Sequence, residues 1–231
     1  MWQKPVKKML YLLNIGNFAP EVTTLTYPLI FKYAEKIEAD IHVITERKFP
    51  DYPVTYEKLQ IFELAQQHNN DWNIYLDSDA LVHPDMFDIT NHLPKDTVMH
   101  NGKDMASNRW TYDRFFLRDG RNIGSCNWFT VASDWCIELW KPIVDLTCEQ
   151  MIKNIHPVNS EITTIITPDH LIDDYVLSRN IAQYGLKFTT FIDMLIALGQ
   201  PGGAYFWHVY TISIEKKVEE IKAKMLEWKL A

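Results

Sequence analysis

The amino-acid sequence predicts an α/β domain whose central sheet is mostly parallel and flanked by helices. Three short apolar runs, 9–13, 41–45 and 74–76, have the length and composition of buried strands. Segments with the apolar spacing of helices lie between them, at 27–38 and 56–68. The alternation of strand and helix favours parallel strands joined by right-handed crossovers.

The ends of these three strands indicate where a ligand is expected. In open α/β sheets, ligands bind outside the carboxyl ends of the strands. The loops that follow Leu13, Thr45 and Leu76 are therefore expected to share one rim of the sheet.

The second half of the chain is less regular. Its expected strands are 97–100, 128–132 and 205–210, and its expected helices are 134–144, 168–184 and 213–230. Thr167 and Pro168 form a helix start, and Gly185 is expected to end that helix. The long polar loop 101–121 carries four arginines, and we hypothesise that it closes over a bound ligand.

The last expected helix has one apolar stripe and one face rich in lysine. Ile214, Val218 and Ile221 belong to the stripe, while Lys216 and Lys217 belong to the polar face. This pattern is typical of a helix packed on the domain with a solvated face. The alternative is a contact with a membrane surface or a partner protein.

Composition places the chain among ordinary globular proteins. Its 231 residues fit a single domain, and the formal net charge of −7 argues against a nucleic-acid partner. Cys126, Cys136 and Cys148 are odd in number and lack zinc spacing, so reduced thiols and a cytoplasmic location are expected. The sequence contains no apolar run long enough for a transmembrane segment. It does not indicate an oligomeric state.

The most informative motif is Asp77-Ser78-Asp79, directly after the third strand. Side chains two residues apart in an extended chain point the same way, so the two carboxylates should converge. Converging carboxylates repel each other unless a cation lies between them, and Mg²⁺ or Mn²⁺ prefers such oxygen ligands. The motif therefore indicates half of a metal–diphosphate site. The alternative is a strand that ends in a polar turn.

Three further features have chemical interest. Asp173 and Asp174 lie in an expected helix, where one carboxylate can act as a general base or orient a sugar, or where both simply cap the helix. His208 lies in an aromatic strand, either as a third metal ligand or as a core residue. In the segment 122–127, Gly124 permits close backbone approach, and Asn122 and Asn127 offer hydrogen bonds to hydroxyl groups.

These motifs resemble those of nucleotide-sugar glycosyltransferases with the GT-A fold. The segment 58–64 followed by Ile74-Tyr75-Leu76-Asp77-Ser78-Asp79 is similar to the helix and "YLDxD" strand of enzymes related to glycogenin. Asn122-Ile123-Gly124 resembles the "NxG" that opens their acceptor-side strand, and the segment 173–180 resembles their acidic pair and helix. His208 lies where many of these enzymes place a metal-binding histidine.

The resemblance implies a single GT-A domain, Rossmann-like, over 1–231. Residues 1–100 would form the nucleotide-sugar half, 101–212 the acceptor half, and 213–231 a C-terminal amphipathic helix. In the implied site, Asp77, Asp79 and His208 bind a metal, Mn²⁺ or Mg²⁺. Asp173 and Asp174 are the implied catalytic carboxylates, and Asn122 and Gly124 would contact the acceptor. The implied donor contacts are Asn14, Gly16, Thr45, Glu46, Lys58, Asp77 and Asp79.

The implied reaction moves a hexose, from UDP-glucose or UDP-galactose, to a hydroxyl of a glycan or lipid-linked acceptor. One departure from the glycogenin-like pattern is that His208 is followed by Val209-Tyr210-Thr211, so the "HxxGxxKPW" ending is absent. The stereochemistry of transfer stays open. The alternatives are a phosphatase of the haloacid dehalogenase type, which also uses Asp-x-Asp after a strand, and a non-catalytic sugar-binding protein.

Overall fold

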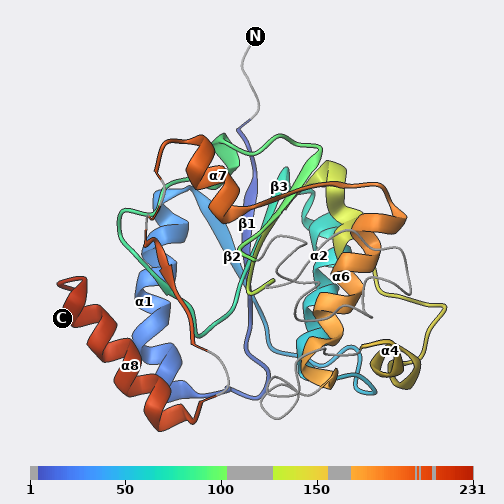
Figure 1. Cartoon of the computed structure of the whole chain (residues 1–231), viewed down its shortest axis with the longest axis horizontal. Coiled ribbons are helices and arrows are strands. Elements are labelled where there is room, and N and C mark those ends of the chain that lie inside the picture. Colours follow the sequence, from blue (N-terminus) through green and yellow to red (C-terminus); the bar gives the residue numbers. More distant parts are fainter. Residues whose placement is uncertain are drawn as a thin grey trace.

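The computed structural model describes residues 5–102, 127–155, 168–200, 202, 204–209 and 212–230. A six-stranded sheet runs through its centre in the order β2-β1-β3-β6-β5-β7 (Figure 1). The strands are β1 Lys8–Leu13, β2 Ala39–Ile44, β3 Trp72–Leu76, β5 Thr97–His100, β6 Phe129–Ser133 and β7 Lys187–Thr190.

The sheet is mostly parallel, as the sequence predicts. β1 pairs in parallel with β2 and β3, and β5 pairs in parallel with β7. β6 is antiparallel to both of its neighbours, β3 and β5. The parallel order β2-β1-β3 brings the carboxyl ends of the first three strands to one edge, where the backbone N–H of Asn14 donates to the Ile44 carbonyl at 2.9 Å.

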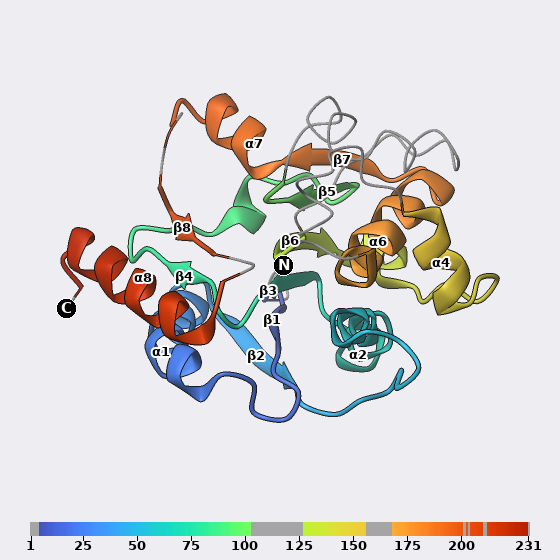
Figure 2. The ribbon, with the colours of Figure 1, turned by 60° about the horizontal axis from the view of Figure 1, so that its bottom comes forward.

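Helices cover both faces of the sheet. Figures 1 and 2 show α1 and α8 on one side and α2, α4 and α6 on the other. The helices are α1 Pro20–Lys36, α2 Ile61–His68, α4 Cys148–Asn154, α6 Ile172–Gln183, α7 Phe191–Ala197 and α8 Ile214–Glu227. Each face has its own apolar core, one centred on Tyr75, Trp140 and Tyr175 and one on Ile30, Ile74 and Phe129.

Several boundaries differ from those expected. α1 begins at Pro20, before the expected residue 27, because the fixed φ of a proline suits the first helical position. The expected helix 134–144 is a 3₁₀ helix, Asp134–Trp140, and it ends there because Lys141 precedes a proline and is extended. The expected helices 56–68 and 168–184 each begin as a 3₁₀ helix, over Val54–Gln60 and Pro168–Leu171.

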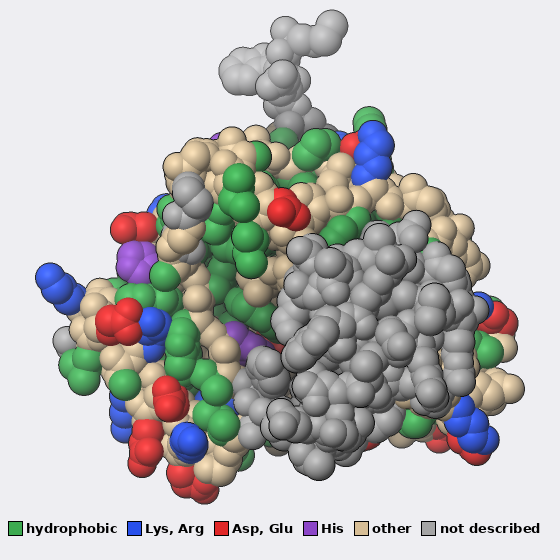
Figure 3. Space-filling model, viewed as in Figure 1, with side chains coloured by type: hydrophobic (Ala, Val, Ile, Leu, Met, Phe, Trp, Pro, Cys, Tyr) green, Lys and Arg blue, Asp and Glu red, His purple; other side chains and the backbone are tan. Residues whose placement is uncertain are grey.

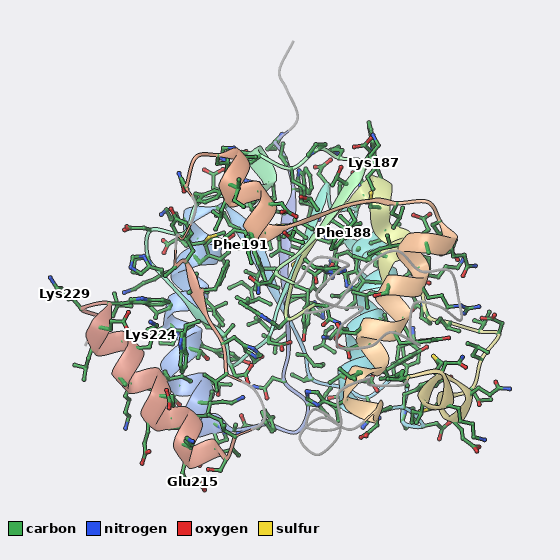
Figure 4. All side chains as sticks on the ribbon, in the orientation of Figure 1. Lys187, Phe188, Phe191, Glu215, Lys224 and Lys229 are labelled. Carbon is green, nitrogen blue, oxygen red and sulfur yellow. The ribbon has the colours of Figure 1, made fainter. Side chains whose placement is uncertain are left out.

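The strand expected at 205–210 is shorter in the structure. It is reduced to β8, Phe206–Trp207, which pairs antiparallel with β4, Leu81–Val82. Gly185 ends α6 with a φ of +60°, as expected. β7 and α7 follow it and lie outside the expected elements; Figure 4 shows their side chains Phe188 and Phe191.

The C-terminal helix α8 packs against α1. Its buried Ile221 lies in a small core with Val22, Leu29 and Leu81, so the apolar stripe of α8 faces the domain as expected. Acidic and basic side chains are intermixed over the exposed side of α8 (Figure 3). In the part of the chain that the structure describes, every helix is too short or too polar to cross a bilayer.

Candidate active site

Asp77 and Asp79 lie immediately beyond the carboxyl end of β3. All five strand residues are buried, and the chain then turns, with the Ala80 N–H donating to the Asp77 carbonyl at 3.0 Å. The intervening Ser78 is tied to the neighbouring strand, because its hydroxyl donates to the Leu13 carbonyl at 2.8 Å. The turn therefore fixes both carboxylates at the edge where the first three strands end.

His208 is brought to the same place by the pairing of β4 with β8. Leu81 pairs with Trp207, so the next residue along β8 lies beside the aspartate turn that precedes β4. Nε2 of His208 is 3.1 Å from Oδ1 of Asp79 and 3.5 Å from Oδ2 of Asp77. The imidazole also stacks on Trp128, with the ring centroids 4.9 Å apart. Its orientation is thus fixed from two sides.

Asp77, Asp79 and His208 together form a group that can hold a metal ion. One ligand atom from each residue lies within 4.8 Å of the others. Two carboxylate oxygens and one imidazole nitrogen suit Mn²⁺, which accepts both kinds of ligand, better than Mg²⁺, which strongly prefers oxygen. The donor set therefore fits the expected metal.

The two aspartates have different electrostatic surroundings. Burial raises the pKa of Asp77, and the nearby charges of Lys58 and His208 offset this only in part. Burial also acts to raise the pKa of Asp79, but hydrogen bonds and charge from His208 and Lys217 outweigh it and hold that pKa below its usual range. The Lys217 ammonium of α8 contacts Oδ2 of Asp79. Asp79 is therefore ionised at neutral pH.

The acidic pair at the start of α6 forms a second buried cluster. Asp173 is buried and accepts the ammonium of Lys58, with Nζ and Oδ2 2.5 Å apart. Asp174 accepts a hydrogen bond from the amide nitrogen of Asn127, also at 2.5 Å. Lys58 in turn donates to the amide oxygen of Asn127. Both carboxylates are thus held by specific partners that go beyond helix capping.

Lys58 and Tyr75 connect the two acidic clusters. The Lys58 ammonium lies 4.5 Å from the centre of the Tyr75 ring, and the Tyr75 hydroxyl donates to Asp77 at 2.5 Å. Burial lowers the pKa of Lys58, but the charges of Asp173 and the neighbouring aspartates outweigh this and raise it. Lys58 is therefore a buried cation between the expected metal ligands and the expected catalytic carboxylates.

Two further residues belong to the site in the structure. The side-chain amide of Asn127, which the sequence indicates as a hydrogen-bonding group, bridges Lys58 and Asp174. Lys217 was not expected at the site, because it lies on the helix face expected to be solvated; its side chain is only 12% exposed. The position of Lys217 depends on how α8 docks, for which the sequence contains no local signal.

The expected donor residues of the first two loops lie along the same edge. The side-chain amide of Asn14 donates to the Tyr27 hydroxyl, which lies 3.2 Å from Oγ of Ser78. Gly16 has a φ of +66°, a backbone conformation that favours glycine. Thr45 and Glu46 are exposed beyond the edge strand β2, so β1 separates them from the metal group.

The expected acceptor residues Asn122 and Gly124, and the arginines of the loop 101–121, lie outside the described residues.

Comparisons with known proteins find structures with a similar fold but no family model or curated protein with a similar sequence. No protein-family model and no curated protein matches the chain. A solved structure, a glycosyltransferase involved in the glycosylation of the major capsid of PBCV-1, is similar with a TM-score of 0.52 and 11% identity, over 94% of this chain and 99% of that one. The two chains share a fold. This likeness agrees with the GT-A architecture that the motifs predict.

A second structure is a mutant of Drosophila β1,4-galactosyltransferase 7 in complex with manganese, UDP-Gal and xylobiose. It has a TM-score of 0.45 and 12% identity, over 89% of this chain and 71% of that one. A likeness at this level carries no argument about the present site.

Proposed function

We propose that this protein is a metal-dependent glycosyltransferase that moves a hexose from a nucleotide sugar to a hydroxyl group. The observation that carries the proposal is the convergence of Asp77, Asp79 and His208 at the carboxyl end of β3. This is the edge of an α/β sheet at which ligands bind. The fold shared with a glycosyltransferase supports the same conclusion.

The reaction needs a diphosphate to leave while positive charge develops on the sugar. A divalent ion held by Asp77, Asp79 and His208 would act as a Lewis acid toward the diphosphate. The rigid turn after β3 and the stacked imidazole would hold the donor in one orientation, and fixed positioning itself lowers the barrier. The protein's own contribution is therefore geometry and charge at the leaving group.

The second cluster supplies a carboxylate on the acceptor side. Asp173 is committed to the buried Lys58 ammonium, whereas Asp174 is half-buried and accepts a hydrogen bond from the neutral side-chain amide of Asn127. We assign to Asp174 the role of accepting the proton of the acceptor hydroxyl, which corresponds to an inverting reaction. Lys58 and Asn127 are positioning residues in this scheme.

UDP-glucose and UDP-galactose are the proposed donors, and a glycan or lipid-linked hydroxyl is the proposed acceptor. Asn14 and Gly16 follow β1, next to the metal group, and would meet the nucleotide. Thr45 and Glu46 follow β2, one strand further along the same edge, and would meet its more distant part.

The test is hydrolysis of a panel of nucleotide sugars with and without Mn²⁺. We expect slow, Mn²⁺-dependent release of nucleoside diphosphate from one donor, and its loss in Asp79→Asn. The exposed Asp40 gives a matched control, Asp40→Asn, which removes a carboxylate at the amino end of β2, opposite the edge that carries the site, and should keep the activity.

Two results would overturn the proposal. One is the lack of release from every donor, combined with the lack of Mn²⁺-dependent binding of UDP or GDP. The other is Mg²⁺-dependent release of phosphate from simple phosphomonoesters, which would indicate a phosphatase.

A further inference from the structure

Lys217 differs from the other lysines of the C-terminal helix. Its ammonium contacts Oδ2 of Asp79, while His208 approaches the other oxygen of the same carboxylate. Lys216 and Lys222 of the same helix are exposed. Lys217 lies on the helix face that the sequence predicts to be solvated. It nevertheless places a positive charge next to the metal group.

Apolar packing also holds α8 in place. Ile221 is fully buried against Val22 and Leu81, and the neighbouring Val218 and Met225 pack on the same core. Figure 4 shows Glu215 at the beginning of α8 and Lys224 towards its end, an order that suits the helix dipole. Because apolar packing docks the helix, the charge of Lys217 is available for a role at the site.

We propose that Lys217 is a positioning residue that makes metal and nucleoside diphosphate bind cooperatively, a role that rests on the proposed function. With Lys217, the two carboxylates and the ammonium present a net charge of −1 to an arriving divalent ion; without it, they would present −2. The ammonium contacts Asp79, a carboxylate that the metal also needs, so it opposes binding of the metal alone. A diphosphate gives the ammonium a second negative partner, so that it can leave Asp79 to the metal. The two ligands are coupled because the ammonium changes partner; a charge fixed in one position would not couple them.

The consequence is a coupling between the two ligands. The protein binds Mn²⁺ weakly by itself and more tightly when a diphosphate is present, and reciprocity requires the same factor for diphosphate binding. This arrangement disfavours a loaded metal site without donor.

The test measures Mn²⁺ binding by calorimetry with the full chain, in the absence and in the presence of UDP. For Lys217→Met we expect a lower Mn²⁺ Kd without UDP. We also expect the ratio of the Kd without UDP to the Kd with UDP to fall by at least about threefold relative to wild type, because the variant has no ammonium that competes with Mn²⁺ for Asp79 in the absence of UDP. Lys217→Arg should keep the ratio, and the exposed Lys216→Met is the matched control that should also keep it.

A ratio for Lys217→Met within about threefold of wild type, or a Mn²⁺ Kd that is not lowered, would overturn the inference. A failure of the proposed function is distinguishable, because wild-type protein would then show no Mn²⁺-dependent binding of UDP at all. Thermal unfolding of each variant reports whether α8 stays docked, since loss of docking would lower the Tm.

Discussion

At the scale of single residues, Asp173 and Asp174 are sequence neighbours with different surroundings. Asp173 neutralises a lysine whose side chain is 3% exposed, whereas Asp174 faces an amide. Removing one partner of a buried ion pair leaves an uncompensated charge, which costs more than the pair itself contributes. The same substitution, aspartate to asparagine, is therefore expected to affect a different property at each position.

Asp173→Asn should mainly lower stability. Because Lys58 would remain as a buried cation without the carboxylate that contacts it, we expect the free energy of unfolding to fall by about 3–5 kcal/mol, measured by urea denaturation. Asp145→Asn breaks the exposed pair with Arg179 and should cost less than about 1 kcal/mol. Adding Lys58→Met to Asp173→Asn should recover part of the loss. A double variant no more stable than Asp173→Asn would contradict this account.

Asp174→Asn should mainly lower turnover. The asparagine oxygen can still accept the hydrogen bond from Asn127, so the fold and the donor KM should be kept. If Asp174 accepts the acceptor proton, kcat falls by about 10²–10⁴-fold. Asp169→Asn, at an exposed position just before the same helix, serves as the control. A kcat within a few-fold of wild type would instead indicate a retaining reaction or another base.

The site residues differ in how far the sequence could predict them. Asp77 and Asp79 follow from a local pattern, because a strand that ends in Asp-x-Asp places both carboxylates together. His208 needed the family resemblance, since 129 residues separate it from Asp79. Lys217 could not be predicted, because its place depends on the packing of α8 against α1 and not on any local pattern.

At the scale of elements, the regular strands and helices of the first half were predictable because their apolar residues follow one period. The second half was harder to predict, since its short elements carry few residues from which a period can be recognised. β8 has two residues, and β7 has four. β6 also reverses direction between parallel neighbours, a pairing that only tertiary contacts specify.

The pairing of β5 with β6 contains a histidine that should make stability depend on pH. His100 is buried, and Nδ1 lies 2.7 Å from the Thr130 hydroxyl. That hydroxyl donates to the Asn127 carbonyl, so Nδ1 carries the proton and the ring is neutral. Burial, together with the charge of Lys58, lowers the pKa of His100 to about 3. The pairing of β5 with β6 thus helps to fix the backbone of Asn127, whose side-chain amide donates to Asp174.

Because the folded pKa lies below the unfolded value, protonation favours the unfolded chain. The stability contribution is complete above the unfolded pKa of 6.5 and falls as the pH drops from there towards 3. Between pH 7 and pH 5 we expect a loss of about 2 kcal/mol from His100, measured by urea denaturation. The same loss in His100→Asn as in wild type would show that other groups cause it.

At the scale of the whole molecule, the charges that the proposed function needs lower the folding stability at one edge of the sheet. Two carboxylates and the end of a buried strand meet at one point, and burial already raises the pKa of Asp77. A raised pKa means that the ionised form present at neutral pH is disfavoured in the folded state. Residues that bind a ligand are often arranged at a cost in folding stability when the ligand is absent.

Asp77→Asn should separate these two effects. The asparagine oxygen can still accept the Tyr75 hydroxyl, and the neutral side chain removes both the repulsion from Asp79 and the cost of burying a charge. We therefore expect the Tm of the metal-free variant to be equal to or above that of metal-free wild type, measured by calorimetry.

Ligands should reverse that order. At about 100 times their Kd, Mn²⁺ and UDP together should stabilise wild type by about 2.7 kcal/mol, which corresponds to about 5–10 °C in Tm for a domain of this size. Asp77→Asn should lose this shift, and Asp40→Asn should keep it. If Asp77→Asn lowers the Tm without ligands, the carboxylate has a structural role; if it keeps the ligand shift, Asp77 is not a metal ligand. The expected results are a Tm at or above that of wild type without ligands and no increase in Tm with them. This combination would arise only if the carboxylates at this edge of the sheet bind a cation.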